Sequence, residues 1–347
     1  MDNKRYVYTR VKILIPVMLV ILALLIILAV AVGAVYIPFG QVVGIILKKW
    51  GLLGNIKFPE GQESIIYMVR LPRVIVASLA GAALATCGAV LQGMFRNPMA
   101  DPGILGVSGG AGLGAVTAIA LGFSAQSIYF MPLFASAGAI IAVSIIYVLS
   151  TRGGKIPTLT LILSGIAVST FFGALIQLIL SNVSQYEVHT FVFWTMGGLN
   201  GMMWEQVRLI VLPVVILIAV LFTFARDLNV MLLGEEEAQS VGLNPSKTRK
   251  LLLLFTSLTT AVAISVCGPV SFVGLIVPHI IRLLVGPDHR ILIPAGAVGG
   301  AMFLVCCDMI SRIVPSGEIG VGIVTSLLGA PYFLYLLIKA RKEGVAI

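Results

Sequence analysis

The sequence predicts an all-α polytopic membrane protein with about ten transmembrane helices and both termini in the cytoplasm. Hydrophobic residues make up 59% and charged residues 11% of the 347 residues, and the mean hydropathy is +1.07. A soluble domain has roughly 25% charged residues. Apolar runs long enough to cross a bilayer recur along the chain, and positive residues lie at their ends, where they set the orientation of a membrane protein.

Ten spans follow when about 20 residues are assigned to each crossing. The predicted spans are 13–36, 72–94, 104–122, 128–150, 158–181, 206–225, 251–268, 271–286, 291–313 and 322–340. The eighth span is short, because Pro278 interrupts it and His279 and Arg282 make it polar. The first could instead be a cleaved signal peptide, but its apolar run is too long for one. We expect residues 1–347 to form a single transmembrane domain.

The distribution of positive charge sets the orientation. With the N-terminus inside, sixteen of the 23 Lys and Arg residues fall on the cytoplasmic side, as the positive-inside bias requires. An odd number of spans would place the basic segment 339–342 outside, against that bias. We therefore expect a multi-pass membrane protein with both termini in the cytoplasm. The net charge of +9 then reflects membrane orientation, and we expect the lipid bilayer and no nucleic acid as a partner.

A polar interruption separates the second and third spans. Segment 96–103 contains two prolines and an aspartate, and it cannot continue a helix, since each proline lacks an amide proton and restricts the residue before it. Gly106, Gly110 and Gly114 follow at intervals of four, so they share one helical face and allow close approach of another helix. We interpret this segment as a hinge at which a pore opens and closes.

The longest inner segment, about 227–250, contains a predicted short helix at 235–243. Three glutamates occupy its first turn, where the helix dipole favours acidic residues, and Gly242 and Pro245 terminate it. Two interpretations are open: an ordinary amphipathic connector, or a helix that receives force from a soluble partner.

Neither a nucleotide-binding loop nor a catalytic motif occurs in the sequence. Segment 153–156 lacks both the upstream glycine and the final Ser or Thr of a phosphate loop, and no H-E-x-x-H occurs. The four cysteines lie in apolar runs without metal or disulfide spacing. We expect no enzyme activity, no metal and no cofactor in this chain. Asp308 and Arg312, four residues apart, are predicted to pair near the outer end of the ninth span.

Several longer motifs occur in one order along nearly the whole chain. They are RLPR at 70–73, GAALA at 81–85 with Gln92, NPMADPGILGVS at 97–108, GEEEA at 234–238 with Gly242 and Leu243, CGPVSFVGLIVPH at 267–279, GVGIVT at 320–325 and LGAPYF at 328–333. With these motifs the chain resembles the FecCD-type permeases of bacterial ABC importers. The resemblance implies a type II ABC importer permease fold in a bacterial or archaeal cell (inner) membrane. It also implies that the chain pairs with a second copy as a homodimer.

The resemblance also implies partners and sites. The partners are two cytoplasmic ABC ATPase subunits, which would hold ATP and Mg, and an extracytoplasmic substrate-binding protein. The implied cytoplasmic gate consists of Asn97, Met99, Pro157 and Thr158. The implied ATPase-coupling residues are Glu235, Glu236, Glu237, Ala238, Ser240, Gly242 and Leu243. Docking of the binding protein is assigned to Arg70, Arg73 and Arg312, taken as exposed cations.

The expected function is ATP-driven import by alternating access. Family members carry ferric siderophores, haem, cobalamin or oxyanions. An iron chelate, either a ferric siderophore or haem, is the first expectation because iron chelates are the commonest cargo of the family. Cobalamin or an oxyanion is the alternative within the family. A secondary transporter and a non-transporting scaffold are the rival classes; the sequence has no carboxylate near the middle of a span, which weighs against proton-driven transport.

Overall fold

The computed structural model describes residues 2–33, 35, 37–49, 51, 52, 58, 59, 61–151, 157–314 and 317–342, all of them in helices or in the turns between helices. The helices are α1 (Asp2–Ala31), α2 (Phe39–Lys49), α3 (Gln62–Ser64), the π-helix η1 (Ile65–Arg70), α4 (Leu71–Phe95), the 3-10 helix η2 (Pro102–Leu105), α5 (Val107–Ala120), α6 (Phe123–Gln126), α7 (Phe130–Ser150), α8 (Thr158–Leu180), α9 (Gln185–Thr195), α10 (Trp204–Thr223), α11 (Ala225–Met231), α12 (Glu235–Ser240), α13 (Pro245–Cys267), α14 (Val273–Val285), α15 (His289–Arg312) and α16 (Val321–Lys342).

The number of apolar helices agrees with the predicted ten spans. Among the described residues, eight helices are long and apolar enough to cross a membrane, and α5 and α14 are shorter apolar helices. The last two stand where the third and eighth spans were predicted. Helix α14 is short as predicted, but it continues through Pro278, which does not interrupt it, and ends before Gly286. An all-helical, multi-pass membrane protein is therefore confirmed.

One span starts earlier than predicted. The second membrane helix runs without a break from Gln62 to Phe95. It therefore begins about ten residues before the predicted start at 72. Pro72 lies in the first turn of α4, and η1 precedes it with wider π-type bonding, in which the Leu71 amide donates to the Ile66 carbonyl. A π-turn changes the helical register, so the missing amide of Pro72 does not end the helix.

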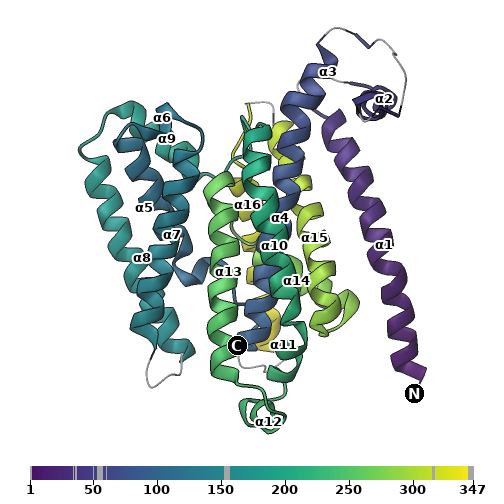
Figure 1. Ribbon diagram of the computed structural model, residues 1–347, viewed down its shortest axis with the longest axis vertical. Helices are drawn as coiled ribbons and strands as arrows, with labels where there is room; N and C mark the ends of the chain where they lie inside the picture. The colour runs from purple at the N-terminus through teal and green to yellow at the C-terminus, as the bar shows by residue number, and fades with distance from the viewer. Residues whose placement is uncertain are drawn as a thin grey trace.

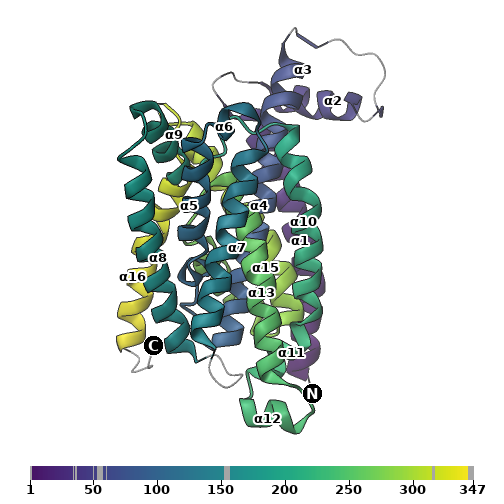
Figure 2. The ribbon, with the colours of Figure 1, turned by 60° about the vertical axis from the view of Figure 1, so that its left-hand side comes forward.

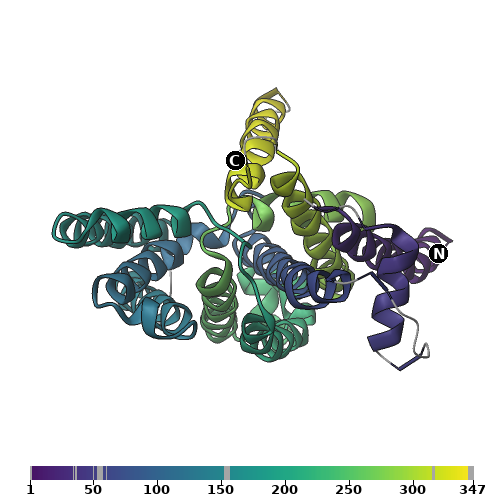
Figure 3. The same cartoon turned by 90° about the horizontal axis from the view of Figure 1, so that it is seen from above.

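Both ends of the chain lie at the same end of the bundle. Figure 1 shows the start of α1 at the bottom, together with α12, and α2 and α3 at the top. Figure 2 shows α16 ending at that same lower end. We call it the inner end, because the charge distribution places both termini in the cytoplasm. The opposite end, with α2 and α3, is the outer end. Seen from above, the purple α1 lies at the edge opposite the blue and teal α5–α9 (Figure 3).

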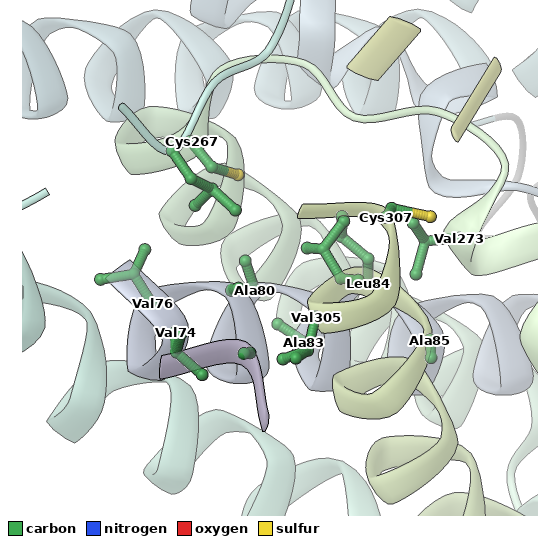
Figure 4. Close-up of a cluster of buried hydrophobic side chains, with 14 of the residues drawn as sticks. Val74, Val76, Ala80, Ala83, Leu84, Ala85, Cys267, Val273, Val305 and Cys307 are labelled. Carbon is green, nitrogen blue, oxygen red and sulfur yellow. The ribbon is translucent and has the colours of Figure 1, made fainter. Parts of the chain in front are cut away.

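Helix α4 is the centre of the larger core. Its small residues pack against α13, α14 and α15, as Figure 4 shows for Ala83 beside Val305. A close approach joins α4 to α15: a Cβ built on Gly300 would lie 2.8 Å from the carbonyl carbon of Gly81. Without a hydrophobic driving force inside lipid, such close van der Waals packing of small residues is what holds membrane helices together.

A second core joins α5 to α7 and α8. A Cβ on Gly110 would overlap the backbone of Gly138 in α7, and one on Gly114 would overlap the backbone of Phe134. The predicted packing face of α5 is confirmed for these two glycines. Gly106 differs, because its φ of 68° makes it the left-handed cap between η2 and α5.

The glycine contact between α4 and α15 gives a matched test of packing. We expect Gly300→Ala to lower the stability by about 1–3 kcal/mol, because the added methyl group forces two backbones apart. Gly296→Ala, one turn away on the same helix, is the control, since a Cβ there meets nothing within 4 Å. The measurement is thermal unfolding of the purified protein in detergent. Equal unfolding temperatures for the two variants would contradict this account.

Candidate functional site

The predicted hinge lies at the inner end of α4 and is a tightly braced turn. Arg96 has a left-handed φ of 51°, and the amide of Asn97 donates to the carbonyl of Gln92 at 3.1 Å. The Asn97 side chain accepts from the amide of Met99 at 2.8 Å, and Asp101 accepts from the amide of Gly103 at 2.8 Å. The left-handed conformation is unusual for a residue other than glycine at the end of a helix. The side-chain hydrogen bonds of Asn97 and Asp101, together with the two prolines of the hinge, hold the chain in this turn.

The four predicted gate residues fall into two places. Asn97 and Met99 are half-buried within the hinge, whereas Pro157 is exposed and caps the start of α8. Thr158 is the first residue of α8, and its side chain lies outside the described part of the chain. The segment after the hinge is in contact with α8, because Gly106, just after η2, packs against Ser169 of α8. Their function as a gate stays a prediction.

A short acidic helix is present at the inner end, as predicted. Helix α12 carries three exposed glutamates in its first turn, while Ala238 is fully buried. Gly242 has a φ of 85°, and the amide of Leu243 donates to the carbonyl of Ala238 at 3.0 Å, which closes the helix. Glu235 is held to Arg249 of α13 at 2.6 Å. The helix therefore presents carboxylates to the inner side from a fixed position.

The hinge and α12 share one cavity. A space of about 510 Å³ is lined by the end of α4, by the three glutamates of α12 and by Arg249. Arg96, the first residue of the hinge, belongs to this lining. The structure thus brings together two sequence features that stand about 140 residues apart in the chain.

The three arginines assigned to docking are not exposed, and the sequence-based premise is wrong on this point. Arg70 is 6% exposed and donates to the carbonyls of Val30 and Ala31, each at 2.8 Å, and to that of Val35. Arg312 donates to the carbonyls of Ala29 and Val32 at 3.0 and 3.1 Å. The physical reason is the end of α1, whose last carbonyls have no partner within the helix. Cations near a helix C-terminus satisfy those carbonyls.

Arg73 belongs to an ion-pair network at the same end. Asp308, fully buried on α15, pairs with Arg73 at 2.8 Å and with Arg312 at 2.9 Å, and the second pair confirms the prediction from their spacing. Arg73 also pairs at 2.9 Å with Glu318, which lies just before α16. The side chain of Arg73 is only 8% exposed. The arginines therefore join α1, α4, α15 and the start of α16 to one another.

Sequence reasoning missed Glu318 and the outer cavity beside it. A cavity of about 640 Å³ is bounded by Arg73 and Glu318 on one side and by polar Asn200 and Gln206 on another. Trp194 lines the same space. Residue spacing carries no signal for Glu318, because its partner stands 245 positions earlier. The cavity opens between segments that meet only in the folded bundle.

Comparison with known proteins gives consistent results. The model of the FecCD transport family matches residues 21–339. The chain is 48% identical to the cobalamin import system permease protein BtuC of Halobacterium salinarum, over 80% of this chain and 74% of that protein. It is 37% identical to the hemin transport system permease protein HmuU of Yersinia pestis, over 86% and 91%. A solved structure described as an inward-facing conformation of a metal-chelate type ABC transporter matches with a TM-score of 0.82 and 29% identity, over 94% of this chain and 99% of that one.

The buried network gives a stability prediction. We expect Asp308→Asn to lower the stability by about 3–5 kcal/mol, because two buried guanidinium groups then lose their shared carboxylate. Glu63→Gln is the matched control, since Glu63 pairs with Lys48 at 2.6 Å but is 46% exposed. An exposed pair contributes about 1 kcal/mol or less. Thermal unfolding in detergent measures both variants. A loss for Asp308→Asn no larger than that of the control would show that the network is not structural.

Proposed function

The chain belongs to the FecCD transport family of ABC importer permeases, and from this premise we propose that it imports a metal chelate, with cobalamin as the first candidate and haem as the second. The observation that supports cobalamin is the 48% identity to a permease named for cobalamin import. The relative named for hemin transport is 37% identical. This order revises the sequence-based preference for an iron chelate, which rested on the frequency of such cargo in the family.

ATP hydrolysis takes place in partner subunits in this proposal. The sequence has no phosphate-binding loop, whereas α12 holds three exposed glutamates at the inner end. Two ABC ATPase subunits would each receive one such helix. The coupling segment would comprise Glu235, Glu236, Glu237, Ala238, Ser240, Gly242 and Leu243. Within it, Ala238 is fully buried and would anchor the helix to its own bundle rather than touch the partner.

A second copy of the chain would complete the pathway. Helix α16 projects from the bundle (Figure 3), and both α8 and α16 expose large apolar side chains, among them Phe171 and Leu327. In a homodimer these helices would border a central path. Each copy would then contribute Asn97, Met99, Pro157 and Thr158 to a constriction at the inner end. Closing of the ATPases would move α12 and open this gate.

An extracytoplasmic binding protein would deliver the cargo at the outer end. Because Arg70, Arg73 and Arg312 are buried and paired, we propose that they act in docking indirectly. They hold the end of α1 and the segment before α16 in fixed positions, and those segments border the surface that the binding protein meets. The outer cavity of about 640 Å³ is the first space that the cargo would enter.

The cargo proposal predicts ATP-dependent uptake of cobalamin. The assembled importer, with its ATPase subunits and its binding protein, is reconstituted in proteoliposomes and supplied with cobalamin or haem. We expect cobalamin uptake to require ATP on the side of the membrane where the ATPase subunits lie. We also expect cobalamin uptake to exceed haem uptake. Haem uptake alone would transfer the assignment to haem. Uptake that persists without ATP would identify a secondary transporter and overturn the proposal.

Charge reversal on α12 tests the coupling site. We expect Glu235→Lys, Glu236→Lys and Glu237→Lys together to reduce uptake at least about tenfold, because like charges placed at a contact with a partner cost several kcal/mol. Co-purification of the ATPase subunits should fall in parallel. Glu63→Lys, which reverses an exposed carboxylate at the outer end, is the control. Full uptake in the triple variant would favour an ordinary connector.

A further inference from the structure

A polar cluster at the inner end joins three helices that are distant in sequence. Asn229 of α11 donates through Nδ2 to Asp288 at 2.6 Å. Its Oδ1 accepts from the backbone amide of His289 at 2.9 Å and lies 2.9 Å from Nδ1 of the same residue. His289, the first residue of α15, is 1% exposed and packs against Gly93 in the last turn of α4. We call Asn229, Asp288, His289 and Gly93 the junction cluster.

The hydrogen bonds fix the orientation of the Asn229 amide. Asp288 lies outside the membrane span, and its pKa is lowered to about 2, chiefly by a hydrogen bond from Arg290. It is therefore a carboxylate at neutral pH and can only accept, so the amide nitrogen of Asn229 must face it. The amide oxygen then faces the two donors of His289. Replacing this amide by a carboxylate would set two like charges against each other without a change of volume.

Gly93 makes room for the His289 ring. A Cβ built on Gly93 would lie 2.7 Å from Cε1 of His289 and closer still to Nε2. No other residue type fits at position 93 without displacement of the ring. The contact between α15 and the last turn of α4 is therefore a direct one, from ring to backbone.

Each side of the junction cluster leads within a few residues to a functional element. Helix α11, which carries Asn229, ends at Met231, and α12 begins at Glu235. On the other side, the carbonyl of Gly93 accepts from the amide of Arg96, where the hinge begins, at 3.3 Å. The path from α12 to the hinge thus runs through the side-chain amide of Asn229 and the imidazole ring of His289, which contacts Gly93.

A second contact keeps the last turn of α4 from moving away on its own. The side chain of Gln92 accepts from Arg282 of α14 at 2.9 Å and donates to the carbonyl of Leu275 at 3.1 Å. The end of α4 is consequently held by α14 on one side and by His289 on the other. A displacement of His289 would therefore move the last turn of α4 together with α14.

We propose that the junction cluster transmits the movement of α12 to the hinge at 96–103, with Asn229 and His289 as positioning residues. The proposal rests on the proposed function, since it takes α12 as the point at which the ATPase acts. It goes beyond that function by naming the contact through which hydrolysis in the partner and opening of the inner gate are linked.

The test uses the assembled importer with Asn229→Asp. Spin labels are placed at position 97 of both copies in a background without the four native cysteines, and the distance between the labels is measured with and without nucleotide. In the wild-type background the distance should change with nucleotide. In Asn229→Asp we expect that change to be lost and uptake to fall about tenfold, while ATP hydrolysis changes by less than about twofold. Asn182→Asp, the same substitution at the exposed end of α8, is the control and should behave as wild type.

A second pair of variants keeps the test valid if Asn229→Asp does not fold. Gly93→Ala displaces the ring, and Gly93→Ala with His289→Ala removes the clash and should restore thermal stability. We expect the double variant to remain uncoupled, because the ring that carries the movement is gone. Recovery of normal coupling in the stable double variant would show that the cluster serves only packing, and would overturn the proposal.

The distance measurement needs no cargo, so it separates this inference from the assignment of the cargo. A gate that follows nucleotide normally in Asn229→Asp contradicts the junction cluster while leaving the importer function intact. A wild-type gate that ignores nucleotide contradicts both the proposed function and this inference.

Discussion

Close packing of α4 against α14 and α15 is the constraint on which the other features depend. Gly81 meets Gly300 of α15, and Gly88 meets Gly274 of α14, with no side chain between the backbones. Such approach removes lipid from the interface and lets dispersion forces act over many atoms. Because α4 is fixed along most of its length, both of its ends have defined positions. The outer end supplies Arg70 and Arg73, and the inner end supplies the hinge.

The outer end shows how a membrane protein accommodates buried charge. Asp308 is fully buried, and it is tolerated because two arginines surround it. One of the two, Arg312, and the neighbouring Arg70 also donate to the carbonyls at the end of α1, which would otherwise lack partners in a medium without water. One set of charges thus solves two problems, the burial of a carboxylate and the termination of a helix. Their location inside the bundle follows from this double use.

The features that the sequence predicted well are those with local signals. Proline and glycine mark the hinge at 96–103, clustered glutamates mark α12, and apolar runs mark the spans. The continuous helix through Pro72 was missed because a π-turn leaves no residue pattern that separates it from an α-helix. The arginines were misplaced for a different reason. The acceptors of Arg70 and Arg312 are backbone carbonyls at and just after the end of α1, about 40 or 280 positions away, and any residue type supplies a carbonyl. The acceptors of Arg73 are carboxylates more than 230 positions away.

The two ends of the bundle are joined by different kinds of bond. The outer end uses buried ion pairs between α4 and α15, and separating those would leave uncompensated charge in a medium of low dielectric constant. At the inner end, α11 meets α15 and α4 through the Asn229 amide, which donates to the Asp288 carboxylate, and through the His289 ring, and the ion pair of Glu235 with Arg249 is partly exposed. Breaking and remaking these contacts costs less, about 1.5–3 kcal/mol for a hydrogen bond to a charged group and about 1 kcal/mol or less for an exposed ion pair. A bundle that must stay closed at one place while shifting at another would place its buried ion pairs at the fixed end and its hydrogen bonds and exposed ion pairs at the moving end. The distribution of bonds in this protein therefore favours movement of the inner end about an outer end that is held in place.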